Sequence, residues 1–319
     1  MKISKILKII IPLLIICVIC NCVSQAASAQ EYFSIGMAYY ELGKYEEAEK
    51  WLNRAKMSDR TMTASQYNLG RLAFETQRYE EAAKHFEGIL KIDPDNVLAL
   101  KAAAYSRIKT GDISAAEKHY RKLLSLVPES ADDGYNHALV LYAMERYAEA
   151  EEALANYPFS IEENNDTLLL YARSQKAQGK VEAIDNYAKY LASNSNADVR
   201  YEYAQLLEKN ELYARALEEY KLLLSATDNI KKDNLAEMRF SYARLLLIAD
   251  GASAEGITVL QAAIGDGFSD IEAVEELQKN TKVSAANRDT LRGIVNDMQR
   301  KAESLEQEKS KNNESTNQP

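Results

Sequence analysis

The feature that most constrains the fold of this chain is an internal repeat of 34 residues. Small residues recur at this interval in two series, and a larger residue recurs in a third. The series are Gly36, Gly70, Ala104, Ala138 and Ala172; then Ala48, Ala82, Ala116 and Ala150; then Tyr45, Tyr79, Ile113, Tyr147 and Val181. A period in this range predicts stacked supersecondary units, each of which buries a core only against its neighbours.

Each unit is predicted to be a hairpin of two amphipathic helices. Within residues 66–96 the apolar residues recur every three or four positions in two stripes, on either side of a short turn at residues 76–78. Gly111 and Gly179 supply the left-handed conformation that equivalent turns require, and Pro94 and Pro128 end the second helices. Gly or Ala at a helix crossing lets two backbones approach, so we expect the small series to be structural.

This pattern of small, aromatic and proline positions resembles the tetratricopeptide repeat family, and residues 63–96 match it best. The resemblance covers residues 29–268, about six to seven hairpins, and implies an all-α solenoid wound as a right-handed superhelix. The fifth hairpin is one residue shorter, so Ala183 and then Ala216 continue the alanine series. The seventh hairpin, around Phe240 to Ile264, matches the pattern weakly.

The residues after the repeats are predicted to close the array. Residues 269–306 form capping helices, in which apolar residues at helical spacing face the last repeat; these are Leu291, Ile294, Met298, Ala302 and Leu305. Residues 307–319 are polar, and we predict a disordered tail there.

The start of the chain is typical of an export signal. Lys2, Lys5 and Lys8 precede an uncharged run at residues 9–20, which is shorter than the roughly 20 apolar residues of a membrane-spanning helix. We therefore interpret residues 1–21 as a signal peptide. The protein is then exported to the cell envelope or periplasm.

Two processing sites compete after this signal. Cys22 ends a segment that resembles the relaxed lipobox of bacterial lipoproteins, notably those of spirochaetes, although Asn21 stands where Gly or Ala is more usual. Lipidation of Cys22 is the interpretation we favour, with residues 22–28 as a linker to the membrane anchor. Ordinary cleavage after Ala29, in Ala27-Ser28-Ala29, and an uncleaved anchor are the alternatives.

Composition excludes several classes of function. The net charge is −9, and the leader holds three lysines and no acidic residue, so the mature chain is more acidic still and nucleic acid is not an expected partner. All three cysteines lie in the first 22 residues. His85, His119 and His137 are the only histidines, and repeat duplication accounts for the first two, so we expect no metal site, no cofactor and no catalytic residues.

In the family that this chain resembles, the first helix of each hairpin lines a concave face that binds segments of partner proteins. The corresponding stripe is rich in aromatic and cationic residues, which concentrate binding energy at interfaces. The predicted partner-binding groove consists of Tyr40, Tyr67, Arg71, Phe74, Tyr105, Tyr142, Arg173, Tyr201 and Arg244. The same stripe also passes through Leu139, Phe240 and Leu247. Packing of these side chains against the next hairpin is the competing interpretation.

The sequence thus predicts a non-enzymatic protein–protein interaction scaffold, lipid-anchored in a bacterial cell envelope, that binds another envelope protein or peptide. Two alternatives stay open. One is a structural protein that assembles into homo-oligomers, and the other is an accessory ligand-binding subunit of a transporter. The residues do not choose the cellular process.

Overall fold

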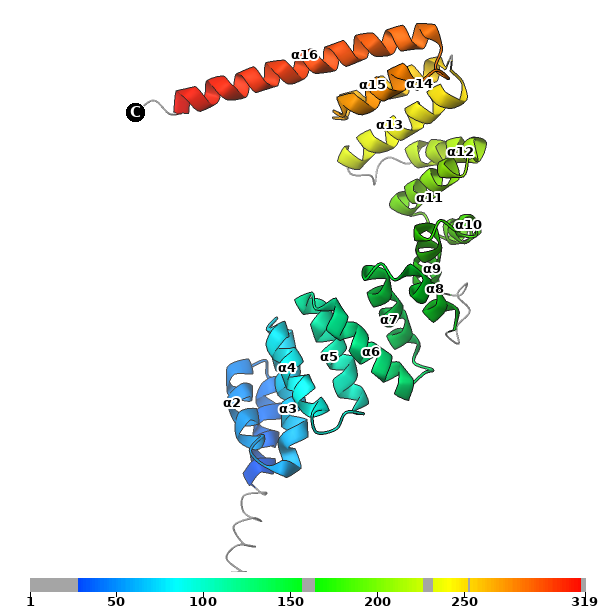
Figure 1. Cartoon of the computed structure of the whole chain (residues 1–319). Coiled ribbons are helices and arrows are strands. Elements are labelled where there is room, and N and C mark those ends of the chain that lie inside the picture. Colours follow the sequence, from blue (N-terminus) through cyan, green and yellow to red (C-terminus); the bar gives the residue numbers. More distant parts are fainter. Residues whose placement is uncertain (1–27, 157–163, 226–231, 252, 317–319) are drawn as a thin grey trace, which may run out of the picture. The chain divides into compact units, whose positions relative to one another are not determined.

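The computed structural model describes residues 28–156, 164–225, 232–251 and 253–316, which form helices joined by turns, with no strand among them (Figure 1). The fold is all-α, as the repeat predicts. The chain divides into two compact units, of which unit 1 ends at Gln178 and unit 2 begins at Gly179. This boundary falls in the turn of the fifth predicted hairpin.

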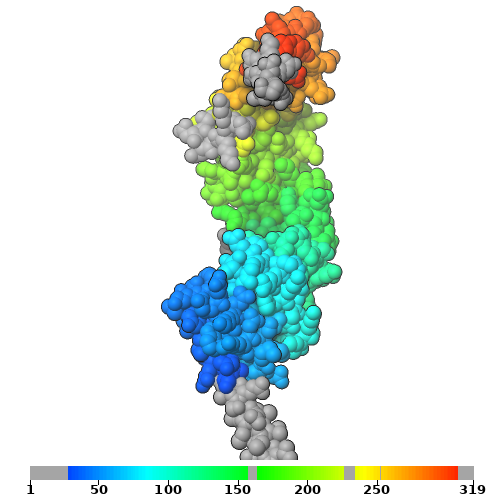
Figure 2. All heavy atoms as spheres, turned by 90° about the vertical axis from the view of Figure 1, so that its left-hand side faces the viewer, coloured from blue at the N-terminus to red at the C-terminus, as the bar shows by residue number. Residues whose placement is uncertain are grey.

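Unit 1 is a stack of helical hairpins. A helix of residues 28–41 precedes α2 (Tyr45–Ala55), and the following helices are α3 (Asp59–Glu75), α4 (Tyr79–Leu90), α5 (Val97–Thr110), α6 (Ile113–Leu126), α7 (Ala131–Ala143), α8 (Tyr147–Ala155) and α9 (Asn165–Ala177). Each first helix also packs on the second helix of the preceding hairpin, since α2 contacts α3, α4 contacts α5 and α6 contacts α7. In the space-filling view the blue and cyan hairpins form one closely packed stack (Figure 2).

Unit 2 contains the remaining helices, which are α10 (Ala183–Ser193), α11 (Ala197–Lys209), α12 (Tyr213–Ser225), α13 (Lys232–Ala249), α14 (Ala254–Gly265), α15 (Ile271–Lys279) and α16 (Ala285–Thr316). Helix α11 packs on α12, and α13 packs on α14. The seventh hairpin is therefore a regular pair of helices despite its weak sequence match. Gly256 lies at its crossing, where an added Cβ would stand 2.7 Å from Cγ of Leu247.

The small residues at the predicted helix crossings are buried. No side-chain surface is exposed at the alanines of the two series, Ala104, Ala138, Ala172, Ala48, Ala82, Ala116 and Ala150, or at Ala183 and Ala216. The prediction that these positions are structural is confirmed for burial, including the one-residue shift in the fifth hairpin. The packing leaves no room for larger side chains at such close approaches.

The turn inside each hairpin contains one left-handed residue. The six equivalent positions have φ between 59° and 81° and are occupied by Gly43, Gln77, Gly111, Glu145, Gly179 and Glu211. Next to two of them, the Arg78 N–H donates to the Ala73 carbonyl at 2.8 Å and the Asp112 N–H donates to the Arg107 carbonyl at 3.0 Å. These bonds are those of a helix C-cap closed by a left-handed residue. The prediction for Gly111 and Gly179 is confirmed.

Helices α15 and α16 cover the last hairpin of unit 2. Their buried residues share one core with α13 and α14, formed by Phe240, Leu247, Leu260, Ala263, Phe268, Val274, Leu277, Leu291, Val295 and Met298, among others. Helix α15 begins where the Asp270 carboxylate accepts the Ala273 N–H at 3.0 Å. Leu305 is 49% exposed, so only the first part of the apolar stripe of α16 is packed.

The C-terminal tail differs from the sequence prediction. We predicted disorder for residues 307–319, but α16 continues through this segment to Thr316. Glu, Lys and Gln occupy many of these positions and are good helix formers. A helix that is already nucleated by a packed segment can extend through such residues without burying apolar surface.

Candidate functional site

The first helices of unit 1 present one repeated surface position to solvent. Arg71 of α3, Tyr105 of α5 and Leu139 of α7 are spaced by 34 residues. The Arg71 side chain is 43% exposed, and Tyr105 and Leu139 are 45% and 38% exposed. Leu98, at the start of α5, is also exposed. We call Arg71, Leu98, Tyr105 and Leu139 the first-helix face.

Arg71 lies at the junction between the first two hairpins. Its guanidinium is 5.0 Å from the centre of the Tyr40 ring and 4.0 Å from Oε1 of Glu75. The Tyr40 hydroxyl donates to the Glu75 carboxylate. Burial and this hydrogen bond raise the pKa of Tyr40 to about 12, so its hydroxyl keeps its proton at neutral pH. Tyr40 and Glu75 therefore hold the Arg71 guanidinium in place at the surface.

Aromatic packing joins the second and third hairpins. The Phe74 ring lies 5.3 Å from the Tyr105 ring and 5.0 Å from the Tyr79 ring, and the Tyr67 ring lies 5.4 Å from the buried Phe86 ring. Phe74 and Tyr67 are partly buried. These two predicted groove residues contribute mainly to packing, whereas Tyr105 keeps an exposed side.

Tyr142 and Arg173 lie further along unit 1, and both are partly buried. The Tyr142 ring packs 5.1 Å from the Tyr147 ring of its own hairpin. Arg173 lies close enough to Tyr135 to influence its pKa, which burial raises and Arg173 opposes. The stripe thus loses exposure after Leu139.

In unit 2, Tyr201 and Arg244 connect neighbouring first helices. The Tyr201 hydroxyl lies 2.9 Å from Oγ of Ser241 in α13, and its ring lies 6.1 Å from that of Tyr220. Arg244 of α13 pairs with Glu208 of α11 at 2.7 Å between Nη2 and Oε1. Both predicted groove residues therefore have structural partners.

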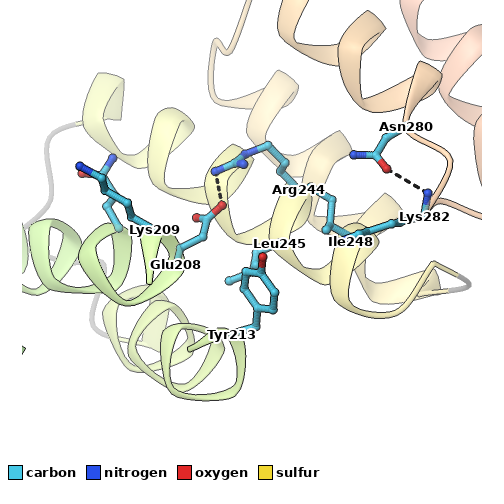
Figure 3. Close-up of a pocket in the computed structure, with 9 residues that line it drawn as sticks. Glu208, Lys209, Tyr213, Arg244, Leu245, Ile248, Asn280 and Lys282 are labelled. Carbon is cyan, nitrogen blue, oxygen red and sulfur yellow. Dashed lines mark hydrogen bonds and ion pairs between the residues drawn. The ribbon is translucent and has the colours of Figure 1, made fainter. Parts of the chain in front are cut away.

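Arg244 also lines an open cavity of about 480 Å³ beside α11, α12 and α13 (Figure 3). The Lys209 and Lys282 side chains line the same cavity, and the Lys282 ammonium is 6.0 Å from the Tyr213 ring centre. The sequence analysis missed both lysines. Lys282 follows α15 and lies outside the repeats, so repeat spacing could not identify it.

Two stripe positions in the seventh hairpin are corrected by the structure. Phe240 is 7% exposed and stacks on Phe268 with ring centres 4.1 Å apart, and Leu247 is fully buried. They belong to the core under α15 and α16 rather than to a binding face. The reason is that the capping helices fold back onto α13, which the repeat pattern alone does not predict.

A buried ion-pair cluster lies between the third and fourth hairpins. The Glu117 carboxylate contacts Arg121 with 3.0 Å between Nε and Oε1, Arg146 at 3.3 Å and His137 at 3.7 Å. Burial alone would raise the pKa of Glu117, but the two guanidinium groups outweigh it and the pKa is lowered. Burial lowers the pKa of His137. The cluster joins α6, α7 and the start of α8.

Cys22 lies outside the described residues. Within the part of the chain that the structure describes, no group of three or more His, Cys, Asp and Glu side chains is placed to hold a metal ion. His85 and His119 instead lie 3.8 Å from Glu81 and 3.4 Å from Glu87. No helix among the described residues has the length and hydropathy needed to cross a membrane.

Residues 29–61 and 73–139 match family models of the tetratricopeptide repeat. These segments contain the hairpins whose crossings and turns are described above. The chain is a tetratricopeptide repeat protein. Repeats of this kind indicate a scaffold for protein–protein interaction.

Known proteins similar to this tetratricopeptide repeat protein include an uncharacterized lipoprotein of Treponema pallidum (strain Nichols), 25% identical over 157 residues, or 49% of this chain and 80% of that one. A tetratricopeptide repeat protein of Parabacteroides merdae has a similar structure, with a TM-score of 0.51, 18% identity, and coverage of 80% of this chain and all of the other. YrrB, a tetratricopeptide repeat protein with an unusual peptide-binding site, has a TM-score of 0.50 at 18% identity, over 56% of this chain and 94% of its own. Both structures support the fold.

Proposed function

We propose that this protein is an exported, lipid-anchored scaffold of a bacterial cell envelope, and that it binds a partner protein or peptide without catalysing a reaction. The observation that carries the binding part is the first-helix face, where equivalent positions in three successive hairpins are exposed. A side chain of Tyr or Arg at such a position can concentrate binding energy. A solvated apolar residue such as Leu139 or Leu98 gains free energy when a partner covers it.

The chemistry of this face favours a particular kind of segment. Tyr105, Leu98 and Leu139 offer apolar contact in the middle, and Arg71 offers a positioned guanidinium at one end. We propose that the bound segment places apolar side chains over α5 and α7 and an acidic group near α3. The other predicted groove residues, Tyr40, Tyr67, Phe74, Tyr142, Arg173, Tyr201 and Arg244, would then act by supporting the shape of the repeats more than by direct contact.

The lipid anchor in this proposal rests on two observations. The basic and apolar leader precedes Cys22, and a relative 25% identical over 157 residues is itself named a lipoprotein. A diacylglycerol on Cys22, with further acylation of the new N-terminus, would give two or more chains, which hold a protein stably at a membrane where one chain does not. Mass spectrometry of the mature N-terminus tests the anchor: a peptide that begins at Gln30 would contradict it.

The binding face is tested by site-specific photo-crosslinking in native membranes. A photoreactive residue at Tyr105 or Leu139 should crosslink the same partner, whereas one at the exposed Lys118 on α6 should not. The Arg71→Ala, Tyr105→Ala, Leu139→Ala triple variant should lose the partner while its circular dichroism is unchanged. Equal crosslinking from all three positions, or unaltered capture by a folded triple variant, would reject the first-helix face.

A further inference from the structure

The first hairpin exposes a helix face that later hairpins bury. Ile35 and Leu42, in and just after the helix of residues 28–41, are 37% and 70% exposed. The residues 34 positions after Ile35 and Ala38 are Leu69 and Leu72, which are 2% and 1% exposed. These leucines lie on α3, which packs on α2 of the preceding hairpin. No described residue precedes the first hairpin, so its equivalent face is left open.

Trp51 of α2 belongs to the same open face. His119, two repeats later, has its Nε2 3.4 Å from Glu87 of the preceding hairpin, which shows the direction of a side chain at this repeat position. Trp51 is the single tryptophan of the chain. Its ring lies 5.5 Å from the Tyr32 ring, and the Arg54 guanidinium is 4.7 Å from its centre.

Lys44 adds a cation to this face. Its repeat equivalents Arg78 and Arg146 reach back to the preceding hairpin, where Arg78 pairs with Glu49 at 2.8 Å and Arg146 pairs with Glu117 at 3.3 Å. In the first hairpin there is no preceding glutamate among the described residues, and the Lys44 ammonium lies 6.0 Å from the Tyr39 ring centre. We call Tyr32, Ile35, Ala38, Leu42, Lys44 and Trp51 the N-terminal end face.

The length of the chain before this face limits what can cover it. Cys22 and Ser28, the first described residue, are six residues apart. Even fully extended, such a segment spans only about 20 Å. A lipid on Cys22 would therefore keep the first hairpin within about that distance of the membrane surface, so the surface is present at high effective concentration.

Head-to-tail stacking of a second copy is a less suitable way to cover the face. It would need an open repeat face at the other end of the array. There, Leu260 and Ala263 of the last hairpin are already buried under Phe268, Leu277 and Leu291. The two ends of the array are therefore not complementary.

We propose that the N-terminal end face lies in the headgroup region of the membrane that carries the lipid on Cys22. The proposal rests on the lipid anchor of the proposed function. Trp and Tyr rings favour the membrane interface. Ile35 and Leu42 lose water there, and Lys44 reaches lipid phosphates. Exposed Glu31 and Glu41 offset the cation, so apolar contact and the short tether supply most of the attraction.

The chain itself provides a specific test. A protein that begins at Cys22 has one cysteine and one tryptophan. Coupling Cys22 to a maleimide lipid in phosphatidylcholine vesicles reproduces the anchor chemically, and Trp51 reports on the end face. We expect a blue shift of the Trp51 emission and quenching by phosphatidylcholine that carries bromine on its acyl chains. Ile35→Ser with Leu42→Ser should abolish both signals without changing circular dichroism.

A second anchoring position is the matched control. In a Cys22→Ser, Ser315→Cys protein the same lipid is attached near the other end of the chain, and Trp51 should not be quenched. Absence of quenching in the Cys22-coupled protein would overturn the proposal. So would a blue shift that depends on protein density without quenching, which would indicate a second copy on this face. Because the anchor is supplied chemically, these results do not depend on whether cells lipidate Cys22, which the N-terminal mass spectrum decides.

Discussion

Gly70 lies directly against the ring of Phe86. A Cβ added at residue 70 would stand 2.7 Å from both Cε1 and Cζ of that ring, a distance that side chains do not tolerate without movement. Phe86 is itself 2% exposed and is held within the core formed by Ala73, Ala82 and Ala103. The ring therefore has little room to move away.

We expect Gly70→Ala to destabilise the protein by about 1–3 kcal/mol, which is typical of overpacking in a tight core. The measurement is urea unfolding followed by circular dichroism. Gly293→Ala is the matched control, because Gly293 lies exposed in α16 and an added Cβ meets nothing within 4 Å. The control should be neutral or stabilising by up to about 1 kcal/mol. A Gly70→Ala protein as stable as the control would contradict the packing described here.

The turn of the third hairpin gives a second comparison. Gly111 has φ of 81°, where a Cβ costs about 1–2 kcal/mol, so Gly111→Ala should lower the free energy of unfolding by about 1 kcal/mol. Gln77 has φ of 61° at the equivalent position of the preceding hairpin and already carries a Cβ. Gln77→Ala should therefore change stability by less than about 0.5 kcal/mol. Equal losses for the two variants would show that backbone conformation is not the cause.

The buried cluster around Glu117 makes stability depend on pH. Burial lowers the pKa of His137 below its ordinary value of 6.5, so the unfolded chain binds this proton more readily, and stability falls as the pH drops through about 6.5 toward the folded-state pKa. The pKa of Glu117 is also lowered, and its contribution is lost as the pH falls below about 4.5.

The measurement for this third prediction is the free energy of urea unfolding at several pH values between about 7 and 5. In His137→Gln the decrease over this interval should be smaller than in the unaltered protein, because one titrating group is removed. The comparison uses the slope with pH, so a uniform loss of stability in the variant does not affect it. Parallel curves would show that His137 does not contribute.

The sequence predicted the helices and their crossings because both depend on local pattern. Ala82 and Gly70 are small for a reason that lies within one hairpin, and the repeat shows the same choice several times. The turn at Gln77 was placed correctly, but its positive φ was not foreseen, because Gln gives no sign of it. Only the spacing of 34 from Gly43 and to Gly111 indicates it.

The candidate site was harder to predict because exposure depends on contacts between hairpins. Tyr67, Phe74 and Tyr105 share one stripe of aromatic residues, yet only Tyr105 keeps a large exposed surface. Their difference comes from where the next hairpin packs, which a helical stripe does not contain. Phe240 was misplaced for a related reason, since the helices that bury it come from outside the repeats.

Arg107 carries a fourth prediction, because it joins the second and third hairpins through ion pairs that no motif revealed. Its Nε and Nη2 donate to the two carboxylate oxygens of Glu87 at 2.7 Å each, and its Nη1 donates to Glu80 at 2.8 Å. The Arg107 side chain is only 13% exposed. The same hydrogen bonds hold the pKa of Glu87 below its ordinary value.

We expect Arg107→Met to lower the free energy of unfolding by about 1.5–3 kcal/mol, as for the loss of hydrogen bonds to a charged group. Arg107→Lys should lie between the two, because an ammonium keeps the charge but cannot bind a carboxylate through two parallel bonds. Lys84→Met is the control on the same partner, since Lys84 pairs with Glu80 at 3.6 Å and is 68% exposed. That exposed pair should contribute less than about 1 kcal/mol. If urea unfolding gives equal losses for Arg107→Met and Lys84→Met, the bidentate pair between α5 and α4 is not what stabilises this junction.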